Sequence, residues 1–145
     1  MEIIQIDSYT AIEKYHIAVK HLFNQSLEEH GLKKEDIKLS ENAFKGIIDK
    51  YTREAGVRNL KRQLDKLVRV CSEKIVTGKV EIPYRIRENM LTQILGHDII
   101  RYDLVKEENN PCVVTGLAWT PVGGDILFIE SAFIPGRGNL MVTGQ

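Results

Sequence analysis

The chain has 145 residues, and its 20 Lys and Arg residues are balanced by 20 Asp and Glu residues, which gives a formal net charge of zero. A neutral chain argues against nonspecific nucleic-acid binding as its main role, because that binding depends on excess positive charge. The hydrophobic content of 43% is ordinary for a soluble globular protein, and the length suits one domain or one small domain with part of another. No apolar run approaches the roughly 18 residues needed to span a bilayer, so we expect no membrane association.

The charge is unevenly distributed along the chain. Residues 1–95 hold 17 Lys and Arg against 14 Asp and Glu, whereas residues 96–145 hold 3 against 6, a shift that suggests two units. The two cysteines fall in different units, and Cys71 has the spacing of a core residue while Cys112 lies in the second unit. The sequence lacks a CxxC pair and any His, Cys, Asp and Glu set with metal-ligand spacing. We therefore expect a reducing compartment and no metal site.

The first helix is predicted to begin with a capping box at Thr10 and Glu13, after a short β-branched run at residues 2–6 that is predicted to be a strand. One face of this helix is predicted to point inward as far as about Asn24. That face carries Ile12, His16, Val19 and Phe23. His16 is therefore expected in the core, and His21 and His30 are expected at the surface.

A second helix is predicted from residue 41, with Ser40 as its N-cap and a brief strand just before it at residues 37–39. Its apolar stripe has helical spacing and consists of Phe44, Ile47, Ile48 and Tyr51. Gly56 is expected to end this helix, in the position after the C-cap where glycine commonly adopts a left-handed conformation.

A third, longer helix is predicted to begin at Val57 and to end at Gly78. Its apolar stripe consists of Val57, Leu60, Leu64, Leu67, Val68, Cys71 and Ile75. Arg58 in the first turn is unusual, because a helix N-terminus carries about half a positive charge and favours an anion. Two interpretations remain open. Arg58 and the free N–H groups beside it face an anion such as a phosphate, or Arg58 is a solvated surface residue.

The rest of the first unit is predicted to contain a short extended piece at residues 79–82 and a short helix at residues 87–95, with Met90, Leu91, Ile94 and Leu95 inward and Gly96 as its end. After Pro111 the apolar period changes to two. Strands are predicted at residues 113–120, 125–134 and 139–143, joined by glycine-rich turns at 121–124 and 135–138. Such a meander cannot bury both faces by itself, so residues 111–145 are expected to open a larger domain. Neither turn matches a phosphate-binding fingerprint.

The second and third helices together also fit a helix-turn-helix arrangement. The third helix would place basic residues in a major groove, namely Arg58, Lys61, Arg62, Lys66 and Arg69. Glu54, Asp65 and Glu73 interrupt this basic face, so DNA binding is possible but not indicated. The broader alternative to an enzyme is a small helical module that binds nucleic acid or another protein without catalysis.

Several stretches resemble the ATP-dependent Lon proteases. Residues 51–60 read YTREAGVRNL, residues 114–125 read VTGLAWTPVGGD, and residues 138–145 read GNLMVTGQ. Shorter matches are Tyr9-Thr10 with Glu13-Lys14, and Gly31-Leu32. The resemblance implies a mainly α helical bundle, the AAA+ C-terminal small subdomain, followed by a short antiparallel β segment that begins an α+β protease domain. It assigns residues 1–6 to the last strand of the large AAA+ subdomain, 7–96 to the small helical sensor-2 subdomain, 97–110 to a linker and 111–145 to the proteolytic domain.

The same resemblance implies functional residues. Arg58 matches the sensor-2 arginine that reaches the nucleotide phosphates, and Val57 and Tyr9 are further candidates for this ATP-binding site. Trp119 and Glu130 match positions near the proteolytic pocket. The Walker segments and the catalytic Ser–Lys dyad have no counterpart here, so the chain is expected to be a fragment that is inactive alone and holds no catalytic residue.

The parent protein is expected to be an ATP-dependent serine protease that uses ATP with Mg²⁺. It would assemble as a homohexamer and degrade unfolded, damaged or regulatory proteins. Its expected location is the bacterial cytoplasm, or the mitochondrial matrix in a eukaryote.

Overall fold

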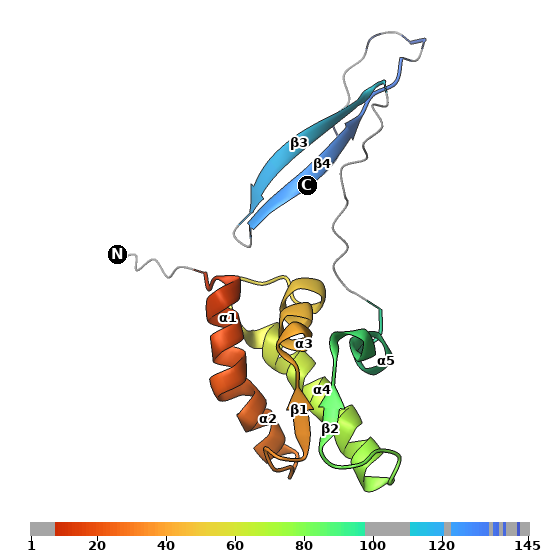
Figure 1. Ribbon diagram of the computed structural model, residues 1–145. Coiled ribbons are helices and arrows are strands. Elements are labelled where there is room, and N and C mark those ends of the chain that lie inside the picture. Colours follow the sequence, from red (N-terminus) through yellow and green to blue (C-terminus); the bar gives the residue numbers. More distant parts are fainter. Residues whose placement is uncertain are drawn as a thin grey trace, which may run out of the picture. The chain divides into compact units, whose positions relative to one another are not determined.

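The computed structural model describes residues 8–97, 111–120, 123–133, 135–136, 138 and 142. The chain separates into two units, residues 1–102 and residues 103–145 (Figure 1). The strand predicted at residues 1–6, the linker from residue 98 onward and most of the strand predicted at 139–143 lie outside the described residues. Within the described part of the chain, no helix is long and apolar enough to cross a membrane.

The first helical stretch is continuous and consists of α1 (Ala11–Ile17), a π-helical turn η1 (Ala18–Leu22) and α2 (Phe23–Glu29). The predicted capping box is present, with the Glu13 N–H donating to Thr10 Oγ1 and the Thr10 N–H donating to Glu13 Oε2 at 2.8 Å. The helix continues five residues beyond the predicted end at Asn24 and stops at Glu29.

The predicted inward face of this helix is wrong in its first half. Ile12 is 71% exposed and His16 is exposed, so His16 is not a core histidine. The face that is buried instead runs through Lys14, Ala18, Phe23 and Leu27. The spacing from Ala18 to Phe23 is five because a π turn bonds residue i to i+5, which rotates the inward face relative to the ordinary helical period assumed from the sequence.

The second helical stretch consists of α3 (Glu41–Gly46) and the π-helical turn η2 (Ile47–Tyr51). Ser40 is its N-cap and accepts a hydrogen bond from the Ala43 N–H, and the predicted stripe is buried. The prediction that Gly56 ends this helix is wrong, because the helix stops at Tyr51 and Thr52 is already extended. The buried Thr52 hydroxyl donates to the Ile48 carbonyl at 2.8 Å and satisfies an acceptor at this helix end.

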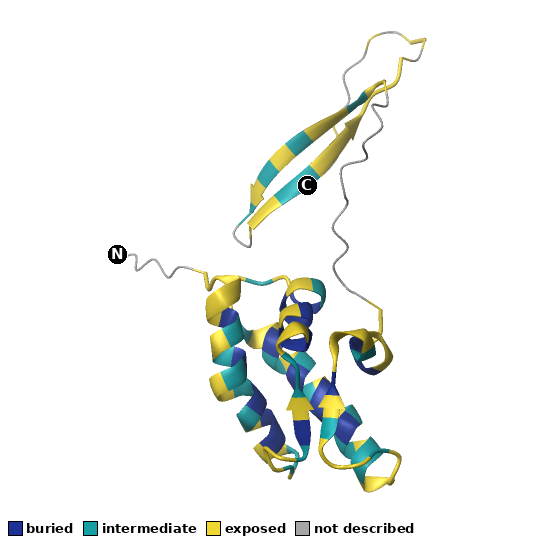
Figure 2. Ribbon diagram, in the orientation of Figure 1, coloured by how far each residue is buried: buried dark blue, intermediate teal, exposed yellow. Residues whose placement is uncertain are grey.

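The long helix α4 (Arg58–Val76) has Val57 as its N-cap. Its buried residues are Leu60, Leu64, Leu67, Val68 and Cys71, as the stripe predicts, while Val57 and Ile75 are half-buried. Gly78 has a left-handed φ of 67° and its N–H donates to the Ile75 carbonyl, which confirms the predicted stop. Each fully buried leucine stabilises the unit by about 1.5–3 kcal/mol, so α4 supplies a large part of the core shown in dark blue in Figure 2.

A parallel two-stranded sheet closes the first unit. Strand β1 (Ile37–Leu39) pairs with β2 (Tyr84–Ile86), with Ile37 beside Tyr84 and Leu39 beside Ile86. The sequence predicted β1 but placed the extended piece after α4 at residues 79–82, so β2 was missed. The chain continues through η3 (Glu88–Met90) and α5 (Leu91–Leu95), where Leu91, Ile94 and Leu95 are buried as predicted and Met90 is half-buried. Gly96 ends α5 with a φ of 95°.

The second unit is described as an antiparallel hairpin of β3 (Val113–Thr120) and β4 (Gly123–Glu130). The first strand has its predicted bounds, and the second begins two residues earlier and ends four residues earlier than residues 125–134. Apolar side chains are exposed on both faces of the hairpin, including Leu117 on one face and Ile129 on the other.

Candidate functional site

The candidate site is the irregular loop at residues 52–57 together with Arg58, the first residue of α4. The Arg58 side chain is exposed and makes no hydrogen bond or ion pair with another residue in the described part of the chain. A cation in this position, at the start of a helix held rigidly by its buried face, is available to an anionic ligand.

The N–H groups of Asn59 and Leu60 beside Arg58 are not free, which weakens the interpretation in which they face an anion together with Arg58. The Glu54 carboxylate accepts from the Asn59 N–H at 2.9 Å through Oε2 and from the Leu60 N–H at 2.8 Å through Oε1. Glu54 therefore supplies the anion that the helix N-terminus favours, because the N-cap residue Val57 has no side chain that could do so. The loop and the helix it precedes are joined by this carboxylate.

Two further contacts hold the loop from outside. The Lys14 side chain is 9% exposed and its ammonium donates to the Glu54 carbonyl. The Tyr9 N–H donates to the Ala55 carbonyl at 3.0 Å. The structure thus brings Tyr9 and Val57 to the same loop as Arg58, with the Tyr9 side chain 48% exposed.

Sequence reasoning missed the contributions of Lys14 and Glu54. Lys14 lies on the same buried face as Ala18 and Leu27. The sequence would have indicated this only if the π turn at residues 18–22 had been predicted. Glu54 precedes its two N–H partners by five and six residues. A capping box pairs residues three positions apart, so that sequence pattern does not detect Glu54.

Trp119 and Glu130 lie near opposite ends of the hairpin. Trp119 pairs with Gly124 beside the turn, and Glu130 pairs with Val113 at the open end. Six ladder positions separate them, which corresponds to about 20 Å along the strands. Trp119 is 86% exposed and Glu130 is exposed, so the hairpin itself neither buries these residues nor brings them together.

The basic face of α4 is partly engaged within the first unit. Lys61 forms an ion pair with Glu29 at 3.0 Å, and the Lys66 ammonium donates to the Leu95 carbonyl at 2.7 Å. Two of the basic residues that a recognition helix would use therefore already have partners, which weakens the helix-turn-helix interpretation.

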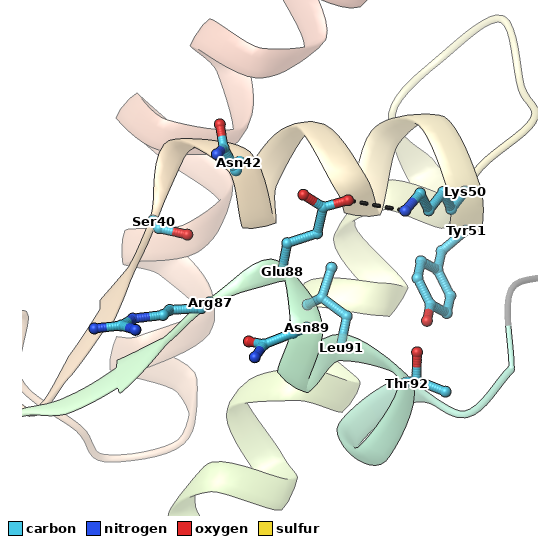
Figure 3. A pocket seen from close by; sticks show the side chains of 9 residues that line it. All are labelled: Ser40, Asn42, Lys50, Tyr51, Arg87, Glu88, Asn89, Leu91 and Thr92. Atoms are coloured by element: carbon cyan, nitrogen blue, oxygen red, sulfur yellow. Dashed lines mark hydrogen bonds and ion pairs between the residues drawn. The ribbon is translucent and has the colours of Figure 1, made fainter.

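A separate pocket of about 620 Å³ is lined by residues of α3, η2, η3 and α5 and by residues that precede α3 and η3 (Figure 3). Its lining residues are Ser40, Asn42, Lys50, Tyr51, Arg87, Glu88, Asn89, Leu91 and Thr92. Lys50 and Glu88 form an ion pair of 2.8 Å across it, and the Tyr51 hydroxyl donates to the Gly96 carbonyl at 3.0 Å. None of the residues predicted as functional lines this pocket, and no set of three metal-ligating side chains occurs among the described residues.

Comparison with known proteins places these elements in one family. The Lon protease AAA+ ATPase lid domain matches residues 28–84, and the Lon protease (S16) C-terminal proteolytic domain matches residues 85–145 directly after it. The chain belongs to the Lon protease family. The Lon protease of Methanosarcina barkeri is 59% identical over all 145 residues, and those of Methanosphaera stadtmanae and Clostridium beijerinckii are 54% and 49% identical. In each case the chain spans 18% of the relative's length.

The two Lon matches meet between Tyr84 and Arg85, which are neighbours within β2. The Lon lid match therefore stops before α5, although α5 buries three residues in the core of the first unit. The unit boundary predicted between residues 96 and 111 stays a prediction, because residues 98–110 lie outside the described part of the chain.

Proposed function

We propose that this chain provides the nucleotide-sensing lid and the first strands of the proteolytic domain of an ATP-dependent Lon protease. The observation that carries this proposal is the succession of the two Lon matches in one chain, lid first and proteolytic domain second. In this proposal the lid is the helical bundle of a sensor-2 subdomain, and it links ATP hydrolysis to proteolysis.

Arg58 is the residue through which the lid meets the nucleotide. Its side chain is exposed, and a Cβ atom added to Gly56 in the same loop would meet nothing within 4 Å, which supports the proposal because the loop is open at this position. Val57 and Tyr9 belong to the same site. ATP, entering with its Mg²⁺, supplies the free energy that drives the movement of the lid.

The buried stripe of α4 explains how a contact at Arg58 can move the whole lid. Leu60, Leu64 and Leu67 are fully buried, so a displacement at the start of α4 is transmitted to the rest of the first unit as a rigid body. The lid then pulls on the proteolytic domain to which it is covalently joined.

The remaining properties of the parent protein are part of the same proposal. It is a serine-type, homohexameric protease that degrades unfolded or damaged proteins in the bacterial cytoplasm or the mitochondrial matrix, and this chain alone is inactive. Trp119 and Glu130 lie near its proteolytic pocket. The exposure of apolar residues on both hairpin faces supports burial of the hairpin within a larger domain.

The test uses a chimaera in which this chain replaces the 145 matching residues of the Methanosarcina barkeri Lon protease. Arg58→Gln should lower ATP-dependent casein degradation at least about tenfold, because a hydrogen bond to a charged group contributes about 1.5–3 kcal/mol. Arg62→Gln is the matched control, since Arg62 is also exposed on α4, one turn further along. Equal casein degradation and ATPase rates in the two variants would contradict the proposal.

A further inference from the structure

We propose that Glu54 and Lys14 are positioning residues that hold the loop at residues 52–57 and thereby fix where Arg58 meets the nucleotide. This inference rests on the proposed function of Arg58. It adds two residues that do not themselves contact the nucleotide and act only through the loop.

Glu54 connects the loop to α4 through both of its carboxylate oxygens. The Glu54 carboxylate accepts from the Asn59 and Leu60 N–H groups at 2.9 and 2.8 Å, and Arg58 lies in the chain between Glu54 and these two donors. A carboxylate that accepts two backbone hydrogen bonds restrains the backbone on both sides of Arg58. The same carboxylate occupies two N–H groups at the start of α4 that could otherwise bind an anion.

Lys14 connects the same residue to α1. Its ammonium donates to the Glu54 carbonyl, and the side chain is almost fully buried. A mostly buried lysine whose ammonium bonds to a neutral carbonyl is a costly way to stabilise a fold, because an apolar side chain of similar length would pack there with less loss of hydration. The arrangement is better explained by the need to hold one particular carbonyl, and with it the loop, in place.

Glu54 is thus the common point of two helices, with its side chain bonded to α4 and its carbonyl bonded to α1. The Tyr9 N–H adds a third contact at the next residue, Ala55. A displacement of about 1 Å in a group that positions a ligand can reduce activity about a hundredfold, so loss of these contacts should act on Arg58 without removing it.

The experiment measures dissociation constants for ATP and ADP in the chimaera described above. Glu54→Gln keeps the size of the side chain but loses the charge and one acceptor, and it should weaken ATP binding about tenfold while ADP binding changes less than about twofold. Lys14→Met should have the same effect as Glu54→Gln, with weaker ATP binding and little change in ADP binding. Lys14→Arg, which retains a cationic donor, should keep the preference for ATP. Ser40→Ala removes a helix cap of α3 and controls for a general loss of stability, with both constants unchanged.

A double-mutant cycle separates positioning from a merely structural role. If Glu54 acts through Arg58, Glu54→Gln should have no further effect on ATP binding in an Arg58→Gln background. Additive effects, or an unchanged ATP constant in Glu54→Gln while Arg58→Gln weakens binding, would overturn the positioning inference and leave the proposed function standing. Unchanged ATP binding in Arg58→Gln itself would overturn both.

Discussion

Gly56 and Gly78 stand on either side of α4, and substituting each by alanine should change stability in opposite directions. An added Cβ would meet nothing within 4 Å at either position, so crowding does not distinguish them. Their backbones do, because Gly78 has a φ of 67° whereas Gly56 is not among the residues with positive φ. The comparison therefore isolates the conformational contribution of each glycine.

The magnitudes follow from this difference. Gly56→Ala should stabilise the first unit by about 0.4–1 kcal/mol, because alanine reduces the conformational freedom of the unfolded chain. Gly78→Ala should destabilise it by about 1–2 kcal/mol, the cost of a left-handed conformation for a residue with a Cβ. In a unit of this size each kcal/mol shifts Tm by about 4–8 °C.

The assay is thermal and urea unfolding of the 145-residue chain, followed by circular dichroism at 222 nm, which reports the helices of the first unit. Gly56→Ala should unfold at a higher temperature than the unsubstituted chain and Gly78→Ala at a lower one. A loss of stability in Gly56→Ala as large as that in Gly78→Ala would refute the reasoning, and would return Gly56 to the left-handed role first expected from the sequence.

The remaining predictions concern thiol reactivity and pH. Burial raises the pKa of the Cys71 thiol to about 11, whereas Cys112 is exposed. Iodoacetamide at pH 8 should therefore alkylate Cys112 and spare Cys71 in the folded chain. Modification of both thiols at equal rates, measured by peptide mass spectrometry, would contradict the burial of Cys71. The backbone and side-chain hydrogen bonds from Thr10 lower the pKa of Glu13 below its usual 4.5, so its carboxylate stabilises the fold above that pH and loses this contribution as the pH falls through the lowered value. Glu13→Gln should accordingly lower Tm at pH 7 and differ less from the unsubstituted chain as the pH falls below 4.5; a constant difference in Tm would disagree.

The parts of the fold that depend on nearby residues could be predicted from the sequence. The capping box at Thr10, the N-cap at Ser40 and the stop at Gly78 are each set by contacts within a few residues, and all three are present. Strand β2 could not be predicted in this way, because its three residues gain their hydrogen bonds from β1, which lies more than forty residues earlier.

The candidate site divides in the same manner. Arg58 could be identified as a candidate from the sequence because a positive charge is unusual at the start of a helix, which is a local signal. The roles of Lys14 and Glu54 could not be predicted, since their contact joins residues forty positions apart and depends on a π turn that shifts the buried face of the first helix. The period of 3.6 residues assumed for that helix placed Ile12 and His16 inward in error.

The pairing of β1 with β2 decides where this chain can be divided in the laboratory. A protein expressed only as far as Tyr84, where the lid match ends, would keep one residue of β2 and leave Lys38 and Leu39 without strand partners. It would also lack Leu91, Ile94 and Leu95 and so expose the side of α4 that they cover. A piece that ends at Gly96 retains the whole core of the first unit. The first twelve residues of the protease match therefore belong structurally with the lid and should be kept with it when the chain is divided.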